Sequence, residues 1–208
     1  AYPDPAIDDF SILTMLCSYA NDREVFEDLI DALMEEFNDM DALIIDLRFN
    51  MGGSGDLVLE LTNRLVPEKQ PVYAYRIRNG AYDEFDAAVV EYAEPRGISF
   101  LDKPIVVLTS NITVSAGDAQ AMVLKDLPNV TLIGETTFGI FSEGIPRLLP
   151  NGWIFTLSTQ RIYSPAGGFY EQEGISPDMV AQPDPNRLLE GYDNVLDVAL
   201  DYLDFVGK

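Results

Sequence analysis

Apolar runs that alternate with amphipathic segments constrain the fold of this chain more than any other feature. Residues 42–47 and 104–109 are runs of mainly apolar residues without a polar alternation, which is typical of strands covered on both faces of a parallel sheet. Residues 23–37 and 114–127 instead repeat apolar residues every three or four positions, which predicts helices. Parallel strands need such crossovers, so the alternation predicts an α/β fold with a mostly parallel sheet flanked by helices.

Further segments complete the expected organisation. We expect a single domain over residues 1–208, with a core at about 11–180 and a C-terminal helix at about 187–206, and we expect the full protein to have an N-terminal region that is absent here. Aromatic and acidic residues at 79–99 favour a surface excursion or lid, and residues 183–185 favour a short linker. The remaining expected strands are 11–19, 71–78, 130–133, two within 145–158 and 161–163, and the remaining helix is 56–65.

Charge and composition exclude several classes of function. The 208 residues include 13 Lys plus Arg and 35 Asp plus Glu, a net charge of −22 that argues against binding nucleic acid or anionic lipid headgroups. No apolar run is long enough to span a membrane. The chain has no histidine and one cysteine, Cys17, which excludes an internal disulfide and Cys/His zinc sites. We therefore expect no metal and no cofactor.

Two loops follow expected strands at the edge where ligands bind in open α/β sheets. The loop at residues 50–55 contains Gly52 and Gly53, and it fits a tight turn, an anion nest or an oxyanion hole. In the loop at residues 110–115, Ser115 stands at the start of an expected helix. A serine at this position is either an N-cap or a nucleophile, and the sequence lacks the GxSxG pattern of the nucleophile elbow. Local sequence leaves these alternatives open.

Four segments taken in order resemble one known family. Residues 42–53 (ALIIDLRFNMGG), 108–118 (LTSNITVSAGD), 133–139 (IGETTFG) and 171–178 (EQEGISPD) are similar to the tail-specific, or C-terminal processing, serine peptidases. The tricorn core protease and interphotoreceptor retinoid-binding protein belong to the same superfamily. The resemblance implies a ClpP/crotonase-like core, peptide hydrolysis through an acyl-enzyme, a polypeptide substrate and no cofactor. It also implies a periplasmic or secreted location, with a cytoplasmic one as in tricorn as the alternative.

The resemblance also implies roles for individual residues. Ser115 would be the nucleophile, and the N–H groups of Ala116 and of either Gly52 or Gly53 would form the oxyanion hole. An acid before the GISPD segment would support the site, by position Glu171 rather than Glu173. Asp118 either faces the pocket or favours the helix dipole, and we favour the dipole.

The sequence departs from the family pattern at the general base. The Ser–Lys branch carries a lysine 25 residues after the nucleophile, where this chain has Ile140. Lys125 fits a solvated surface charge. The tricorn-like branch uses a histidine upstream of the catalytic core, and this chain contains none.

Three accounts fit the absence of a base. The histidine lies on a segment upstream of residue 1, or another base acts, or the site is degenerate and the chain binds peptides or apolar ligands without cleaving them. An acyl-CoA enzyme on the same core is disfavoured, because a net charge of −22 would repel the CoA phosphates. The sequence leaves the oligomeric state and the cleavage preference open.

Overall fold

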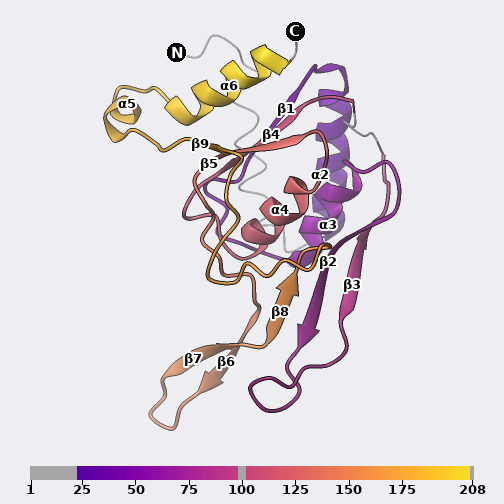
Figure 1. Cartoon of the computed structure of the whole chain (residues 1–208), viewed down its shortest axis with the longest axis vertical. Coiled ribbons are helices and arrows are strands. Elements are labelled where there is room, and N and C mark those ends of the chain that lie inside the picture. Colours follow the sequence, from indigo (N-terminus) through magenta and orange to yellow (C-terminus); the bar gives the residue numbers. More distant parts are fainter. Residues whose placement is uncertain (1–22, 98–101, 207–208) are drawn as a thin grey trace.

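A parallel sheet forms the centre of the computed structural model, which describes residues 23–97 and 102–206 (Figure 1). Its order is β1-β4-β5-β9, and every neighbouring pair is parallel. The strands are β1 (Leu43–Asp46), β4 (Ile105–Thr109), β5 (Val130–Gly134) and β9 (Met179–Val180). The predicted α/β fold with a parallel sheet flanked by helices is therefore confirmed.

Helices cover both faces of this sheet. Ile45, Ile105 and Val107 pack on one side in a cluster with residues of α2 (Arg23–Glu36), α3 (Gly55–Asn63) and α4 (Ala116–Lys125). On the other side Ile44, Val106 and Leu108 pack against α6 (Asn194–Val206). Successive residues of a strand point to opposite faces, so strands covered on both faces must be apolar at consecutive positions.

Antiparallel strands form a second part of the fold. The sheet β3-β2-β8 joins β2 (Gln70–Ile77), β3 (Val89–Ala93) and β8 (Gln160–Tyr163). A separate hairpin pairs β6 (Gly144–Leu148) with β7 (Ile154–Ser158) and extends away from the parallel sheet in Figure 1. Residues 79–97 are mostly exposed, as expected of a surface excursion, and they contain a strand that the sequence analysis did not expect, β3, which pairs with β2. Its residues are mostly exposed, so the apolar alternation of a half-buried strand is weak there.

Short elements account for the other differences from the sequence analysis. Residues 183–185 are not a plain linker, because Asp184 caps the short helix α5 (Pro185–Leu189) and Pro185 occupies its first turn. The expected C-terminal helix at 187–206 is therefore divided into α5 and α6. A 3-10 turn, η1 (Phe37–Asp39), follows α2. The expected strand at 11–19, with Cys17, lies outside the described residues. No helix within residues 23–97 and 102–206 is long and apolar enough to cross a membrane.

Candidate active site

The loops that follow β1 and β4 meet at the carboxyl edge of the parallel sheet. The backbone N–H of Val114 donates to the carbonyl oxygen of Asn50 at 3.0 Å. The Thr113 hydroxyl, completely buried, donates to the carbonyl oxygen of Leu47 at 2.8 Å. These bonds join the glycine loop to the loop that carries Ser115, as expected of neighbouring parallel strands.

Ser115 adopts a backbone conformation that is rare for a residue with a side chain. It is the N-cap of α4, with φ 62° and ψ −118°. A non-glycine residue in such a sparsely populated region costs about 1–3 kcal/mol, and such residues cluster at functional sites. The Asp118 carboxylate, itself fully buried, accepts a 2.9 Å hydrogen bond from the backbone N–H of Ser115. This sharp strand-to-helix turn is the placement typical of a serine nucleophile.

Gly52 lies directly against Ser115. A Cβ atom added to Gly52 would stand 2.7 Å from the Ser115 Cβ, and the φ of Gly52 is +98°. Only glycine fits this contact without a shift. The backbone N–H of Gly52 donates to the Asn50 side-chain oxygen at 2.8 Å, whereas Gly53 lines a pocket together with Ser115 and Ala116.

This pocket has a volume of about 390 Å³ and is lined by the loops and helices beside Ser115 and by the antiparallel sheet. The strands β2 and β8 contribute Tyr73, Tyr75, Gln160 and Ile162 to its wall. Acidic side chains reach it from three further segments, namely Asp56, Glu91 and Glu143. Burial, with smaller contributions from Glu91 and Asp56, raises the pKa of Tyr73 to about 12. The Tyr73 hydroxyl therefore keeps its proton at neutral pH.

The segment that replaces the family lysine is bound to α4 through Asp118. One oxygen of this carboxylate accepts the N–H of Gly139 at 2.9 Å, and the other accepts the N–H of Ile140 at 3.1 Å. The sequence analysis favoured the helix dipole as the role of Asp118. The structure has Asp118 in the first turn of α4, where its charge favours the helix dipole, and its carboxylate also fixes the backbone of Ser115 and of residues 139–140. Lys125 is in the last turn of α4, where it pairs with Asp178 at 3.0 Å.

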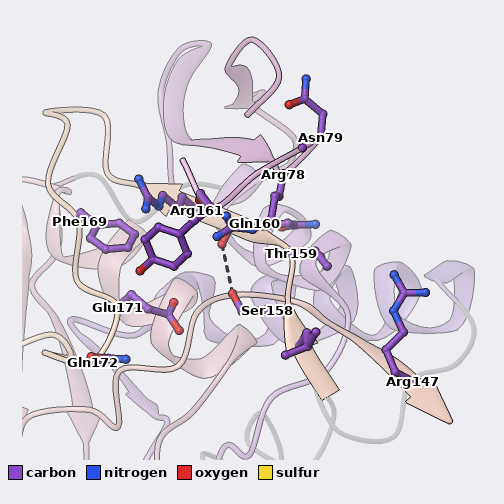
Figure 2. Close-up of a pocket in the computed structure, with 13 residues that line it drawn as sticks. Arg78, Asn79, Arg147, Ser158, Thr159, Gln160, Arg161, Phe169, Glu171 and Gln172 are labelled. Atoms are coloured by element: carbon purple, nitrogen blue, oxygen red, sulfur yellow. Dashed lines mark hydrogen bonds between the residues drawn. The ribbon is translucent and has the colours of Figure 1, made fainter. Parts of the chain in front are cut away.

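Glu171 is outside the lining of the Ser115 pocket but contacts Phe141, which is part of that lining. Its Oε2 atom accepts the N–H groups of Phe141 and Ser142, each at 3.1 Å. Burial raises the pKa of Glu171, these two hydrogen bonds lower it, and the nearby Asp118 carboxylate raises it, for a net increase. Glu171 lines a second pocket, drawn in Figure 2, while the exposed Glu173 lines a third pocket beside Lys125.

The structure thus places Ser115, Ala116 and Gly53 in the lining of one pocket. Gly52 packs against Ser115, and Glu171 accepts the backbone N–H of Phe141. Sequence reasoning missed Asn50, Tyr73, Tyr75 and Gln160. Asn50 directly precedes the glycine pair and offered a local signal, because asparagine side chains often bond the backbone two residues on. Tyr73 and Tyr75 lie on β2 and Gln160 lies on β8, so these residues reach the pocket from distant parts of the chain and leave no local signal.

Comparisons with known proteins agree on one family. The family described as "Peptidase family S41" matches residues 7–181. The carboxy-terminal-processing protease of Bartonella bacilliformis is 30% identical over 156 residues, which cover 74% of this chain and 34% of that protein. The tricorn protease of Thermoplasma volcanium is 27% identical over 161 residues, or 76% of this chain and 14% of that protein. The chain therefore spans only a part of the curated relatives that it matches.

Solved structures show the same fold. The photosystem II D1 C-terminal processing protease superposes with a TM-score of 0.62 at 23% identity, covering 77% of this chain and 40% of that one. The tricorn protease superposes with a TM-score of 0.57 at 27% identity, covering 78% of this chain and 15% of that one.

Proposed function

The chain belongs to peptidase family S41, and from that membership we propose that it is a serine peptidase catalytic domain that cleaves polypeptides through an acyl-enzyme at Ser115. The observation that carries the proposal is the strained backbone of Ser115 at the start of α4, next to a glycine loop and inside a pocket. A capping serine needs no such strain, because N-caps normally have extended backbone angles.

The proposed reaction has two steps. The Ser115 Oγ attacks a peptide carbonyl carbon while a general base takes its proton, and collapse of the tetrahedral intermediate breaks the peptide C–N bond as the amine leaves with that proton. Water then hydrolyses the ester. The chain has no histidine and Ile140 replaces the lysine, so we propose that a histidine from outside these 208 residues is the base.

The N–H groups of Gly53 and Ala116 are the proposed oxyanion donors. Both residues line the Ser115 pocket, whereas the N–H of Gly52 is already bonded to Asn50. This favours Gly53 over Gly52 and gives Gly52 a steric role. Loss of one such donor typically slows catalysis by about a hundredfold to a thousandfold.

Glu171 is proposed as a positioning residue. It holds the backbone of Phe141 and Ser142, and Phe141 lines the Ser115 pocket. The relatives are proteases, which supports a polypeptide substrate. An extracytoplasmic location, which the resemblance implies, also remains part of the proposal.

Labelling with a fluorophosphonate, read by intact mass, tests the proposal. We expect the full-length gene product to gain one adduct, and its Ser115→Ala variant to gain none. Ser176→Ala is the matched control, because Ser176 is an exposed serine outside the lining of the Ser115 pocket and should leave labelling intact. We expect the 208-residue chain alone to label far more slowly, because it lacks the base.

One outcome would contradict the peptidase assignment. If the folded full-length protein stays unlabelled, the site is degenerate, and the chain is a binding module for peptides or apolar ligands. Labelling that survives Ser115→Ala would instead contradict the choice of nucleophile.

A further inference from the structure

A cationic pocket lies next to the Ser115 pocket in this strongly acidic chain. It has a volume of about 1020 Å³, and its lining includes Arg78, Arg147 and Arg161 (Figure 2). Its described lining contains one acidic residue, Glu171, whose Oε2 atom already accepts two backbone N–H groups. The chain has 13 cationic and 35 acidic residues, so this grouping of arginines runs against its overall charge.

The pairing of β2 with β8 brings Arg76 and Arg161 together, and Arg78 directly follows β2. Arg76 stands directly opposite Arg161 in this antiparallel pair. Like charges opposite each other destabilise a sheet. The guanidinium groups of Arg161, Arg78 and Arg76 also lie 4.5, 4.7 and 5.7 Å from the centre of one ring, that of Phe85. Their mutual repulsion would be relieved by an anion in the pocket.

The arginines retain capacity to bind such an anion. Within residues 23–97 and 102–206, their one ion pair joins Arg161 to Asp83 at 3.5 Å, and the Asp83 side chain is 80% exposed. Arg78 donates to the carbonyl oxygens of Ala81 and Tyr82. Arg147 is exposed on the β6–β7 hairpin, and none of the described residues forms an ion pair with it. Guanidinium groups match the geometry of carboxylates, which they bind in a bidentate manner.

The two pockets meet at one residue. Gln160 lines both of them. On β8, Gln160 and Ile162 face the Ser115 pocket, and Arg161, between them, lines the cationic pocket. A polypeptide bound at Ser115 and continuing past Gln160 would therefore enter a pocket of opposite charge, because the Ser115 pocket carries Asp56, Glu91 and Glu143.

We propose that the pocket formed by Arg78, Arg147 and Arg161 binds a carboxylate of the polypeptide substrate, a few residues from the scissile bond. This inference rests on the proposed function. The carboxylate is that of an acidic side chain or of the substrate's C-terminus, since both present the same group to the arginines.

Binding of short peptides to the Ser115→Ala chain tests the pocket without requiring catalysis. The probes are fluorescein-labelled nonapeptides of alanine and glycine, with one Glu placed at each position in turn. Each has a partner with Gln at that position, and each is made with a free or an amidated C-terminus. We expect one Glu position, or the free C-terminus, to tighten binding by about tenfold, as measured by fluorescence anisotropy.

Charge-neutralising variants show whether the arginines are responsible. Arg147→Gln and Arg161→Gln in the Ser115→Ala chain should each remove most of this preference. Arg187→Gln is the matched control, because Arg187 is a half-exposed arginine on α5 and outside the pocket. Arg147 is exposed and unpaired among the described residues, so its loss should leave the fold intact even if Arg161→Gln perturbs β8.

The peptide variants distinguish the two possible sources of the carboxylate. A preference lost on amidation assigns the C-terminal carboxylate, and one lost on Glu→Gln assigns a side chain. Equal binding of charged and neutral peptides, or a preference that survives both arginine variants, overturns the proposal. Carboxylate binding without fluorophosphonate labelling of the full-length protein would support the pocket and contradict the peptidase function.

Discussion

Ser115 and Gly52 form a pair in which each residue constrains the other. The strained backbone of Ser115 is held by Asp118 from one side and by contact with Gly52 from the other. The strain lowers the stability of the fold by about 1–3 kcal/mol, so other contacts in the folded chain must offset it. The loop bonds from Thr113 and Val114 to the segment after β1 contribute to this.

Gly52→Ala should therefore damage both the fold and the site. Its added Cβ would stand 2.7 Å from the Ser115 Cβ, on a backbone with φ +98°. We expect a loss of about 2–4 kcal/mol in the free energy of unfolding, measured in urea, because positive-φ strain of about 1–2 kcal/mol combines with a steric clash. Fluorophosphonate labelling of the full-length variant should fall at least about tenfold, since a small displacement of a reacting group costs much of its rate.

Gly152→Ala separates the two causes. Gly152 has φ +86°, and nothing lies within 4 Å of its added Cβ, so this variant introduces backbone strain without a clash. Its free energy of unfolding should fall only by the contribution of backbone strain, and its fluorophosphonate labelling should be normal. Equal effects of the two variants would show that Gly52 does not shape the position of Ser115.

The residue scale also shows how far the sequence alone could predict the site. The glycine pair and the helix-start serine stand out locally, because turns and helix starts have residue preferences. The choice between Gly52 and Gly53 as a donor was not predictable, because it depends on where the Asn50 side chain turns. The role of Asp118 depends on contacts with residues 139–140, more than twenty positions away.

At the scale of elements, the segment between β5 and β6 is held by two acidic residues from different parts of the chain. Asp118 of α4 binds Gly139 and Ile140, and Glu171 binds Phe141 and Ser142. These four backbone N–H groups belong to no strand or helix, so the carboxylates replace the partners that regular structure would give them. The wall of the Ser115 pocket at Phe141 therefore depends on Glu171.

Glu171→Gln tests this support through its pH dependence. In the folded chain the pKa of Glu171 is raised above its ordinary value of 4.5. At a pH between 4.5 and this raised pKa, the folded chain therefore binds more protons than the unfolded chain. Its ionisation thus lowers stability as the pH rises through that window. The Gln side chain can still accept the two N–H groups but does not ionise.

Urea unfolding at several pH values measures the effect. We expect Glu171→Gln to gain free energy of unfolding relative to the unchanged chain as the pH rises above 4.5, and the two to converge below it. Glu173→Gln removes the same charge from an exposed position two residues away and corrects for the general loss of negative charge. A difference between the two variants that does not change with pH would contradict the assignment.

Elements were predictable in proportion to the apolar surface that they bury. The strands β1 and β4 and the helices α2 and α6 have long apolar patterns, and the structure contains each of them. β9 has only two residues, both exposed, and β3 is mostly exposed, so neither leaves a pattern in the sequence. Their strand character comes from β5 and β2, which lie beside them.

At the scale of the whole molecule, the charge of −22 acts on the fold itself. Folding brings a chain of this length from a radius of gyration of about 49 Å to about 17 Å, which crowds the acidic residues together. Ion pairs oppose this repulsion in places, such as the buried pair Arg64–Glu60, whose side chains are 0% and 1% exposed. Because the chain has 35 acidic and only 13 basic residues, most of the acidic side chains cannot have a basic partner of their own, and they repel one another across the surface.

Added salt should therefore stabilise the folded chain. Raising the ionic strength from about 0.01 M to about 0.1 M shortens the Debye length from about 30 Å to about 10 Å, which screens the long-range repulsion first. The same salt weakens exposed pairs such as Lys69–Glu94, but each of these contributes only about 0.2–1 kcal/mol. The Arg64–Glu60 pair is buried and is screened least. We expect the free energy of unfolding in urea, an uncharged denaturant, to rise with sodium chloride over this range and then to level off. A decrease would mean that local ion pairs, rather than net repulsion, dominate the electrostatics of this fold.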